Sequence, residues 1–349
     1  MKALFLAGGM GTRLRPLTDH LPKPMVPLMN RPMLERNMIT LRHYGIKDII
    51  LSTCYKADYI QRYFGNGEKF GLSITYVKED VPLGTGGAIK NAASCVDGSF
   101  LIFNADILCD MNFADLIRFH RSKEAAVTIA VTTVKNPSAY GVIEYNDNRY
   151  ATSFKEKPKA SEIRSHFINA GIYVFEPWVL KEIMSDRPVS VEREVFPHLL
   201  EKGYRIAVYD GCSYWMDIGT PEKYLRAHRD VFMGKYIISD VQRANGNIAP
   251  VKLPEMDSTV HITQPVYIGD HVKIDPHAVI GPYAVIGDNT SIHTGAHVSH
   301  SVLWSHVVVG KGAVVSQTAV PAGEVVPENS ENVPLKSFKS KAGEAHLSR

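Results

Sequence analysis

Cysteine is scarce in this 349-residue sequence: four are present, Cys54, Cys95, Cys109 and Cys212, and no two of them form a CxxC pair. Zinc sites and the disulfide frameworks of small secreted domains both depend on closely spaced cysteines. The scarcity argues against either kind of site and predicts a protein of the reducing cytoplasm. A chain of this length can bury a core large enough to fold without such links.

Long apolar runs are also absent. A membrane-spanning helix needs about 20 consecutive apolar residues, and no segment of the sequence approaches that length. The opening MKALFLAGG ends in glycines before it could form the apolar core of a signal peptide. We therefore expect no membrane partner.

Neither sign of charge is in large excess. Lysine and arginine number 39 and aspartate and glutamate 36, so the formal net charge at pH 7 is +3. Such a balance is too mild for general attraction to nucleic acid. We expect no nucleic-acid partner, and any basic residue with a functional role must act locally.

The sequence from residue 1 to 236 alternates between strand-like and helix-like segments. Apolar segments typical of buried strands are KALFLA, DIILST, SITYVK, SFLIFN and AVTIAVTTV, and helical spacing occurs in MLERNMITLRHYG and NFADLIRFHRSKE. This alternation is typical of a largely parallel sheet layered by helices. Residues 1–236 are therefore predicted to form an α/β domain with a Rossmann-like mixed, mostly parallel sheet.

Further along, the sequence repeats every six residues. Small or aliphatic residues recur at this spacing from Val260 to Val314, and a second apolar column runs from Ile262 to Val298. This period predicts a short left-handed parallel β-helix over 258–322, rather than a few strands of an open sheet.

Two other segments flank the repeat. Residues 237–257 are weakly patterned and are predicted to be a linker, and residues 323–349 are charged and rich in serine, as in a loose tail. Because a β-helix leaves unpaired strand edges, we expect this domain to assemble a homo-oligomer, a dimer or larger.

The stretch LAGGMGTRLRPLTDHLPKPM, residues 6–25, follows the first predicted strand. A glycine-rich turn at this place either serves only the sterics of the connection or lets backbone N–H groups approach a phosphate. It is not a P-loop, since no GK[ST] follows, and Leu14 stands where the dinucleotide fingerprint has its third glycine. Instead the stretch supplies Arg13 and Arg15, and then Lys23 between two prolines. Cations held in this way predict a polyphosphate ligand.

Two aspartates occur directly after apolar or aromatic segments. Asp106 follows FLIFNA, at the edge where open α/β sheets bind ligands, and Asp217 follows SYWM. Either one alone is more often a loop cap. If the fold brings the two carboxylates together, they could hold one Mg²⁺, which prefers oxygen ligands.

Three further motifs are weaker. The glycines of PLGTGGAIKNA, Gly84 among them, suit either a base lying against the main chain or an ordinary helix start. FKEKPK places Glu156 and Lys157 before a proline, and FINAGIYVF places Asn169 before a strand. Acceptor, cation and amide groups of these kinds read sugar hydroxyls and phosphate.

Taken together, these motifs resemble those of the sugar-1-phosphate nucleotidylyltransferases. The glycine stretch resembles the family signature G-G-x-G-T-R-L-x-P-L-T…P-K-P, which is long and specific. FNADILCD is similar to the family's N-G-D metal strand, with Ala105 where glycine is usual, and EKP, NAGIY and WMDIGTPEKYLRAH match in order. PLGTGGAIKNA, PSAYGVIEY and VSVEREVFPHLL look most like bacterial mannose-1-phosphate guanylyltransferases, which also carry a C-terminal hexapeptide β-helix.

The resemblance implies Mg²⁺-dependent transfer of a nucleotidyl group from an NTP to a sugar 1-phosphate, with GTP and mannose 1-phosphate favoured. It implies catalytic roles for Arg13, Lys23, Asp106 and Asp217, the two aspartates being the metal ligands. The implied nucleotide-binding residues are Leu6, Ala7, Gly8, Gly9, Gly11, Thr12, Arg13, Glu79, Gly84 and Asp106. The implied sugar-phosphate-binding residues are Gly141, Glu156, Lys157, Asn169 and Gly171.

Other functions remain open at this point. Within the family, UTP or dTTP with glucose 1-phosphate is the alternative substrate pair, and a non-catalytic regulatory subunit would keep the same fold. Hexapeptide β-helices also host acyltransferases that rely on a histidine. The candidate histidines are His261, His271, His277, His293, His297, His300 and His306.

Overall fold

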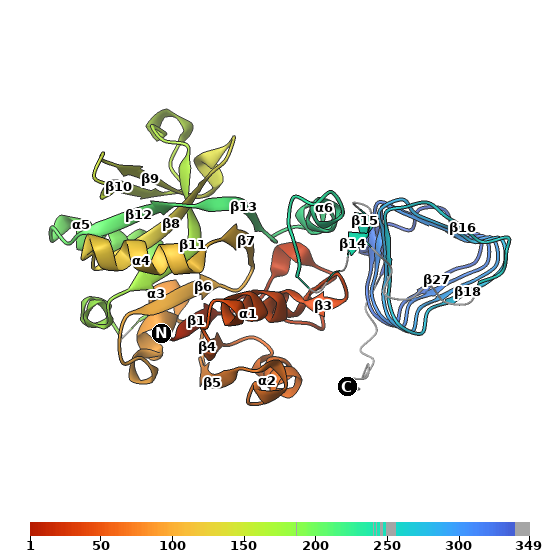
Figure 1. The fold of residues 1–349 in the computed structure, drawn as a ribbon, viewed down its shortest axis with the longest axis horizontal. Coiled ribbons are helices and arrows are strands. Elements are labelled where there is room, and N and C mark those ends of the chain that lie inside the picture. Colours follow the sequence, from red (N-terminus) through yellow and green to blue (C-terminus); the bar gives the residue numbers. More distant parts are fainter. Residues whose placement is uncertain (186, 240, 242, 245–246, 249–255, 339–349) are drawn as a thin grey trace. The chain divides into compact units, whose positions relative to one another are not determined.

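The computed structural model describes residues 1–338 except 186, 240, 242, 245–246 and 249–255, and it divides into two compact units (Figure 1). The first unit comprises Met1–Gly9 and Asn37–Trp215, and the second comprises Met10–Arg36 and Met216–Arg349. Most of the glycine stretch therefore folds with the C-terminal part of the chain. The domain boundary that we predicted near residue 236 does not account for Met10–Arg36 belonging to the second unit.

A nine-stranded sheet forms the core of the first unit. Four neighbouring strands are parallel, in the order β6-β1-β4-β5: β1 (Ala3–Leu6), β4 (Asp48–Thr53), β5 (Ser73–Lys78) and β6 (Phe100–Asn104). The sheet continues beyond β6 through β8 (Val127–Thr133), β9 (Gly141–Tyr145), β10 (Ala151–Glu156), β11 (Phe167–Phe175) and β12 (Ile206–Asp210). β11 runs antiparallel to β6 and β8, and β12 runs parallel to β8. The predicted mixed α/β sheet is confirmed.

Helices cover this sheet. The helices are α1 (Met33–His43), α2 (Ala57–Phe64), α3 (Gly84–Asn91), α4 (Phe113–Lys123) and α5 (Phe196–Glu201). α3 packs against β1, α2 against β5, and α4 against β8 and β12. Leu4 and Phe5 on β1 are both fully buried, which explains why this strand is apolar at successive positions.

Both helices that we predicted from their spacing are present as α1 and α4. The side chain of Asn112 caps α4 by accepting a hydrogen bond from the N–H of Asp115 at 3.2 Å. Asp115 itself lies in the first turn, where a carboxylate suits the helix dipole.

Shorter elements complete the fold. β7 (Ile107–Met111) pairs with β13 (Cys212–Asp217), and the hairpin β2 (Pro27–Leu28) to β3 (Arg31–Pro32) precedes α1. In the second unit, α6 (Pro221–Phe232) follows β13. Part of the predicted linker forms a small antiparallel pair, β14 (Arg243–Ala244) and β15 (Asn247–Ile248), and the rest of its central part lies outside the described residues.

Three four-stranded parallel sheets build the β-helix, drawn in blue in Figure 1. The first sheet contains β16 (His261–Ile262), β19 (Val279–Ile280), β22 (His297–Ser299) and β25 (Val314–Ser316). The second contains β17 (Val266–Ile268), β20 (Ala284–Ile286), β23 (Val302–Leu303) and β26 (Ala319–Val320). The third contains β18 (Lys273–Ile274), β21 (Ser291–Ile292), β24 (Val308–Val309) and β27 (Val325–Val326). The predicted parallel β-helix is confirmed.

The small-residue column does not keep its phase to Val314 as we predicted. Val285 pairs with Val302, so Ser301 lies opposite Ala284 and takes its inward position, fully buried. The slip arises at the corner between the first and second sheets. In one coil this corner has two residues between Gly281 and Ala284, and in the next coil the equivalent corner has one residue between Ser299 and Ser301. Later inward positions are consequently shifted by one residue.

The β-helix also extends further than predicted. β27 completes the last coil with Val326 fully buried, and Glu331 forms a bridge with Val314. The end at residue 322 was therefore placed too early, because the last coil carries charged residues on its outer positions. Residues 339–349 of the predicted tail lie outside the described residues.

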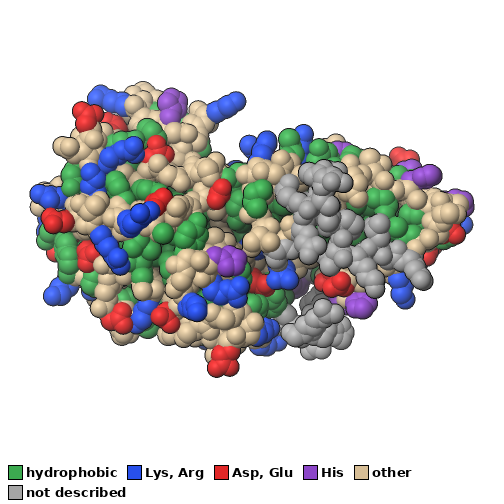
Figure 2. All heavy atoms as spheres, viewed as in Figure 1, with side chains coloured by type: hydrophobic (Ala, Val, Ile, Leu, Met, Phe, Trp, Pro, Cys, Tyr) green, Lys and Arg blue, Asp and Glu red, His purple; other side chains and the backbone are tan. Residues whose placement is uncertain are grey.

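Charge is spread over the surface of the first unit. On the face drawn in Figure 2, Lys and Arg side chains alternate with Asp and Glu and do not gather into one basic patch, in keeping with the small net charge. Within the described part of the chain, the helices are all too short or too polar to span a bilayer.

Candidate active site

The glycine stretch begins in the first unit at the end of β1. Leu6 ends the strand, and the N–H of Ala7 donates to the carbonyl of Ser52 at 2.8 Å. A Cβ built on Gly9 would meet no atom of the described residues within 4 Å, and its φ is not in the left-handed region. Neither packing nor backbone conformation therefore explains glycine at this position. Its effect is to leave open space beside the main chain, as a ligand needs.

Glu79 lies beside this turn. A Cβ on Gly8 would be 3.2 Å from its Oε1. The carboxylate is 6% exposed and accepts hydrogen bonds from the Ser52 hydroxyl at 2.9 Å and the Leu83 N–H at 3.0 Å. Both oxygens are thus engaged by the protein. Within the first unit, Glu79 therefore links Leu83, the residue before α3, to the glycine turn beside Gly8.

The glycines at the start of α3 have a packing role. Gly84 has φ +73°, and a Cβ there would lie 2.5 Å from the carbonyl oxygen of Val189. The N–H of Gly86 donates to the same oxygen at 2.8 Å. The motif therefore begins a helix, and close contact with Val189 explains two of its glycines, while a base beside Gly84 stays a prediction.

Three adjacent strands bring the predicted sugar-phosphate residues together. Gly141 at the start of β9 pairs with Glu156 at the end of β10, and a Cβ on Gly141 would lie 2.9 Å from the Glu156 Oε2. Lys157 follows with its Nζ 3.8 Å from the Glu156 Oε1 and its side chain 58% exposed. β9 also pairs with β11 through Val142 and Ile168, next to Asn169.

Asn169 and Gly171 shape a bulge in β11. The Oδ1 of Asn169 accepts the N–H of Gly171 at 2.8 Å, and its Nδ2 donates to the hydroxyl of Tyr173 at 2.7 Å. Gly171 has φ +70°, and the pairing of β11 with β8 shifts register between Asn169 and Tyr173. The bulge interrupts the β11–β8 ladder, and the Asn169 amide donates to the tyrosine hydroxyl.

Asp106 lies in the turn between β6 and β7. Two residues earlier, the Oδ1 of Asn104 is buried and has no hydrogen-bond partner among the described residues. The Asn104 side chain lies against Gly171, where a Cβ would be 2.6 Å from its Nδ2. A buried carbonyl oxygen in this position is suited to a cation or to a hydroxyl donor.

The second unit brings together Arg13 and Asp217, which are far apart in the sequence. A Cβ on Gly219 would lie 3.1 Å from the Oδ2 of Asp217 and 3.3 Å from the Nη2 of Arg13. Arg13 lies in a 3-10 turn, Thr12–Leu14, and Asp217 ends β13. The Nζ of Lys223, on α6, donates to the Asp217 carboxylate. The Arg13 guanidinium and the Asp217 carboxylate therefore both flank Gly219, and the Lys223 ammonium pairs with the carboxylate.

Lys23 is fixed, as its flanking prolines suggested. It begins the 3-10 turn Lys23–Met25 and is 7% exposed. Gly11 has φ +65°, and a Cβ there would lie 2.9 Å from the Cβ of Lys23. The hydroxyl of Thr18 donates to the Gly11 carbonyl at 2.8 Å. The lysine stem and the glycine turn are packed directly against each other.

A profile of the nucleotidyl transferase family matches residues 2–233, and a profile described as the GMPPB C-terminal domain matches residues 262–331. The chain belongs to the nucleotidyl transferase family. The resemblance drawn from the sequence is confirmed.

Two similar proteins are both named for guanylyl transfer to mannose 1-phosphate. The mannose-1-phosphate guanylyltransferase of Mycobacterium tuberculosis is 43% identical over 234 residues, 66% of this chain and 65% of the relative. The mannose-1-phosphate guanyltransferase of Yarrowia lipolytica is 41% identical over 230 residues, 64% of this chain and 62% of the relative. The nucleotidyl transferase chain thus spans somewhat less than two thirds of these curated relatives.

Solved structures show the same fold. HddC from Yersinia pseudotuberculosis, in complex with GMP-PN, is 31% identical with a TM-score of 0.55, covering 65% of this chain and 97% of that one. A putative glucose-1-phosphate thymidylyltransferase from Bacillus anthracis, 22% identical, has a TM-score of 0.61 over 70% of this chain and 98% of that one, and is similar in fold alone.

Nucleotidyl transferases of this family generally use a divalent metal. Among the described residues, no three His, Cys, Asp or Glu side chains lie together as ligands of one metal ion. The donors near the predicted ligands are oxygens: the Asp106 and Asp217 carboxylates and the amide oxygen of Asn104. This donor set fits a hard cation. Asp106 belongs to the first unit and Asp217 to the second, and their sharing of one metal stays a prediction.

Glu192 lies beside the predicted sugar-phosphate residues, and the sequence reasoning gave it no role. Its carboxylate accepts hydrogen bonds from the hydroxyls of Thr85 at 2.7 Å and Ser190 at 2.8 Å. Burial raises the pKa of Glu156, and the nearby Glu192 carboxylate raises it further. Burial and the same carboxylate hold the pKa of Tyr173 well above its usual range. Glu192 therefore connects the start of α3 with the sugar-phosphate residues, through contacts that its motif VSVEREVFPHLL does not disclose.

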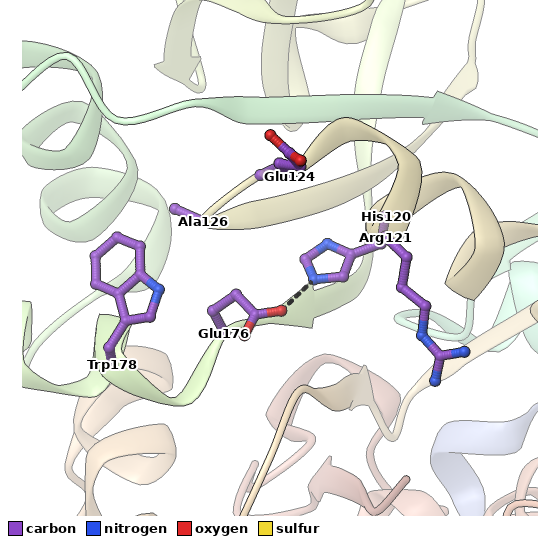
Figure 3. Close-up of a pocket in the computed structure, with 7 residues that line it drawn as sticks. His120, Arg121, Glu124, Ala126, Glu176 and Trp178 are labelled. Atoms are coloured by element: carbon purple, nitrogen blue, oxygen red, sulfur yellow. Dashed lines mark hydrogen bonds and ion pairs between the residues drawn. The ribbon is translucent and has the colours of Figure 1, made fainter.

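A pocket of about 350 Å³ in the first unit has a different lining (Figure 3). His120 points at Glu176, with its Nε2 3.0 Å from the Glu176 Oε1 and its Nδ1 2.8 Å from the Thr128 hydroxyl. The Ser99 hydroxyl donates to the same glutamate oxygen at 2.7 Å. Burial lowers the pKa of His120, so the ring stays neutral within this network. None of the predicted site residues lines the pocket, and its polar groups serve one another.

Proposed function

We propose that the chain transfers a guanylyl group from GTP to mannose 1-phosphate, forming GDP-mannose and releasing pyrophosphate, with Mg²⁺ as the metal. Family membership and the names of its relatives support this function. The observation that carries it is the meeting of Arg13, from the signature, with Asp217, from the distant WMDIGTP motif, around Gly219. That arrangement gives a polyanion a cation beside a carboxylate able to bind metal.

The reaction needs little covalent chemistry from the protein. A phosphate oxygen of the sugar phosphate attacks the α-phosphorus in line, and pyrophosphate leaves. The nucleophile is already an anion near pH 7, so no general base is required. The main obstacle is repulsion between the substrates, on the order of 1–4 kcal/mol for each pair of unit charges at about 4 Å.

Each proposed residue acts on this repulsion or on orientation. Arg13 and Lys23 counter the triphosphate charge, and the packed stem of Lys23 limits its reorganisation. Lys157, largely exposed, counters the sugar phosphate, while Glu156 and Asn169 bind sugar hydroxyls. Asp106 and Asp217 would hold the Mg²⁺, which when bound neutralises phosphate charge.

The nucleotide would lie along the glycine stretch. Leu6, Ala7, Gly8, Gly9, Gly11 and Thr12 would present main chain to it. Glu79 and Gly84 would border the base, and Gly141 and Gly171 would leave room for the sugar. The open space beside Gly9 supports this arrangement, because no side chain of the described residues would collide there with a Cβ.

A pyrophosphate-release assay tests the proposal directly. The purified chain is incubated with Mg²⁺ and each of GTP, ATP, UTP and dTTP, against mannose 1-phosphate, glucose 1-phosphate and galactose 1-phosphate. We expect the highest kcat/KM for GTP with mannose 1-phosphate. A preference for UTP or dTTP with glucose 1-phosphate would contradict the assigned specificity, and no release with any pair would point to a regulatory subunit.

A further inference from the structure

The segment that follows Lys23 is clamped within the second unit. The hydroxyl of Tyr224, on α6, donates to the carbonyl of Pro27 at 2.7 Å. Two residues further on, the N–H of Met29 donates to the Nε2 of His228 at 3.3 Å. Burial lowers the pKa of His228 to about 4, which keeps this nitrogen unprotonated and able to accept. The hairpin β2–β3 is thus held at two points by one face of α6.

The β-helix holds that face of α6 in turn. The indole N–H of Trp304, which follows β23, donates to the hydroxyl oxygen of Tyr224 at 2.9 Å. Trp304 is 7% exposed and Tyr224 is 2% exposed. Burial raises the pKa of Tyr224 strongly, so the hydroxyl keeps the single proton that it gives to Pro27. The direction of both hydrogen bonds is therefore fixed, from Trp304 through Tyr224 to the Pro27 carbonyl.

A second contact joins the hairpin to another coil. The Nδ2 of Asn30 donates to the carbonyl of Ile286, on β20, at 3.2 Å and lies 3.4 Å from the Oδ1 of Asp288. A Cβ on Gly269 would be only 2.6 Å from the Asn30 Nδ2. Glycine at that corner of the β-helix leaves the space that Asn30 occupies.

The clamp lies close to two of the proposed catalytic groups. The N–H of Val26, next to Pro27, donates to the carbonyl of Lys23 at 3.2 Å. On α6, Lys223 precedes Tyr224 and donates to the Asp217 carboxylate. A shift of Tyr224 would therefore be transmitted to the backbone of Lys23 on one side and to the partner of Asp217 on the other.

We propose that the β-helix positions the phosphate-binding segment of the active site, with Trp304 and Tyr224 as positioning residues. The inference rests on the proposed function, because it assigns the clamp to the groups that meet the nucleotide. Reactions between bound anions are sensitive to displacements of about 1 Å. A domain that fixes Lys23 and Asp217 through buried hydrogen bonds thus contributes to turnover as well as to assembly.

Conservative variants test the inference. Trp304→Phe removes the indole N–H and Tyr224→Phe removes one hydroxyl, and each is compared with wild type in steady-state pyrophosphate release. We expect kcat/KM for GTP to fall about tenfold in each, the equivalent of one buried hydrogen bond. KM for mannose 1-phosphate should stay near the wild-type value. Because both changes break one chain, the double variant should be no worse than the more impaired single variant.

Thr318→Val is the matched control within the β-helix. Its Oγ1 is buried and has no hydrogen-bond partner among the described residues, and its N–H, which donates to the Ser301 hydroxyl, is retained. We expect wild-type kinetics from this variant. Thermal melts of all variants separate loss of folding from loss of positioning, and Tyr224→Phe decides the question if Trp304→Phe does not fold.

Calorimetric titration with Mg·GTP distinguishes failure of the inference from failure of the proposed function. A wild-type chain that binds GTP without turnover would overturn the function, and about tenfold weaker binding in both variants would still support the clamp. Wild-type turnover with unchanged kinetics in both variants, whatever their melting temperatures, would overturn the clamp alone. A wild-type chain that neither turns over nor binds nucleotide would overturn both.

Discussion

Arg13 and Asp217 are far apart in the sequence but share Gly219 as a neighbour. The Asp217 carboxylate lies beside the guanidinium of Arg13 and accepts a hydrogen bond from the Lys223 ammonium. The same carboxylate compensates two positive groups that would otherwise repel each other. Replacing the Asp217 carboxylate by a neutral group should therefore change the local charge more than the packing of the side chains.

We expect Asp217→Asn, which keeps the shape of the side chain and removes its charge, to lower kcat about 100-fold or more while the chain stays folded. Asp106→Asn should behave in the same way. Asp110→Asn is the control, because Asp110 is an exposed aspartate on β7 whose carboxylate accepts a hydrogen bond from Ser213 at 2.8 Å. Pyrophosphate release and thermal melts are the measurements. Turnover near the wild-type rate in both variants would exclude the proposed metal ligands.

Glu156 should show a conflict between binding and stability. Burial and the Glu192 carboxylate raise its pKa, so the folded state disfavours its ionised form. Glu156→Gln removes this cost, and we expect it to melt at a higher temperature than wild type at pH 7 while its KM for mannose 1-phosphate rises.

The pH dependence of that gain follows from the direction of the shift. A raised folded-state pKa means that the folded protein binds the proton more tightly, so wild type loses relative stability as the pH rises from the unfolded pKa through the folded pKa. The advantage of Glu156→Gln should be complete above this window and should disappear in acid below it. An advantage that persists unchanged in acid would assign the effect to packing.

At the scale of elements, two glycines of similar sequence context have opposite roles. Gly84 begins α3 with φ +73° and would place a Cβ 2.5 Å from the Val189 oxygen, whereas Gly9 has open space around it. Gly84→Ala should destabilise the fold by about 2–4 kcal/mol through strain and overpacking. Gly9→Ala should leave stability unchanged and raise KM for GTP.

Denaturant unfolding and steady-state kinetics of the two variants form a matched pair. Each is the control for the other, since the substitution is chemically identical. If Gly9→Ala destabilised the chain as much as Gly84→Ala, the space beside Gly9 would not be a ligand site. An unchanged KM for GTP in a stable Gly9→Ala variant would lead to the same conclusion.

Local signals made some elements predictable from the sequence. Helical spacing located α1 and α4, and the six-residue period located the β-helix, because in each case near neighbours in the sequence determine the pattern. The register slip at Ser301 was not predictable, since it depends on a corner that is one residue shorter than the one before. The place of Glu192 likewise depends on contacts with Thr85 and Glu156 that no local pattern reveals.

At the scale of the whole molecule, the glycine stretch shows where sequence reasoning ends. Its motif indicates phosphate binding, because glycines and fixed cations have that chemistry wherever they occur. Most of it belongs to the second unit together with the hairpin that follows it, and that hairpin is joined by hydrogen bonds to Tyr224, His228 and Ile286, far along the chain. Such long-range contacts leave no periodic trace.

The β-helix also has a consequence for assembly. Among the described residues, β16, β17 and β18 at one end of the three sheets and β26 and β27 at the other pair on one side only, whereas β25 also bridges Glu331. The singly paired strands leave edges that a second copy could cover. Val325, on the last coil, is 59% exposed, an apolar side chain at such an edge. We therefore expect a homo-oligomer, a dimer or larger, that associates through this domain.

Sedimentation velocity at micromolar concentration tests this expectation. Wild type should sediment as a dimer or larger, and Val325→Lys should shift the population toward monomer, because a desolvated ammonium at an apolar contact is costly. Met184→Lys is the control, since Met184 is also 59% exposed but belongs to the first unit. A monomeric wild type would contradict association, and equal effects of the two substitutions would place the interface elsewhere than the last coil.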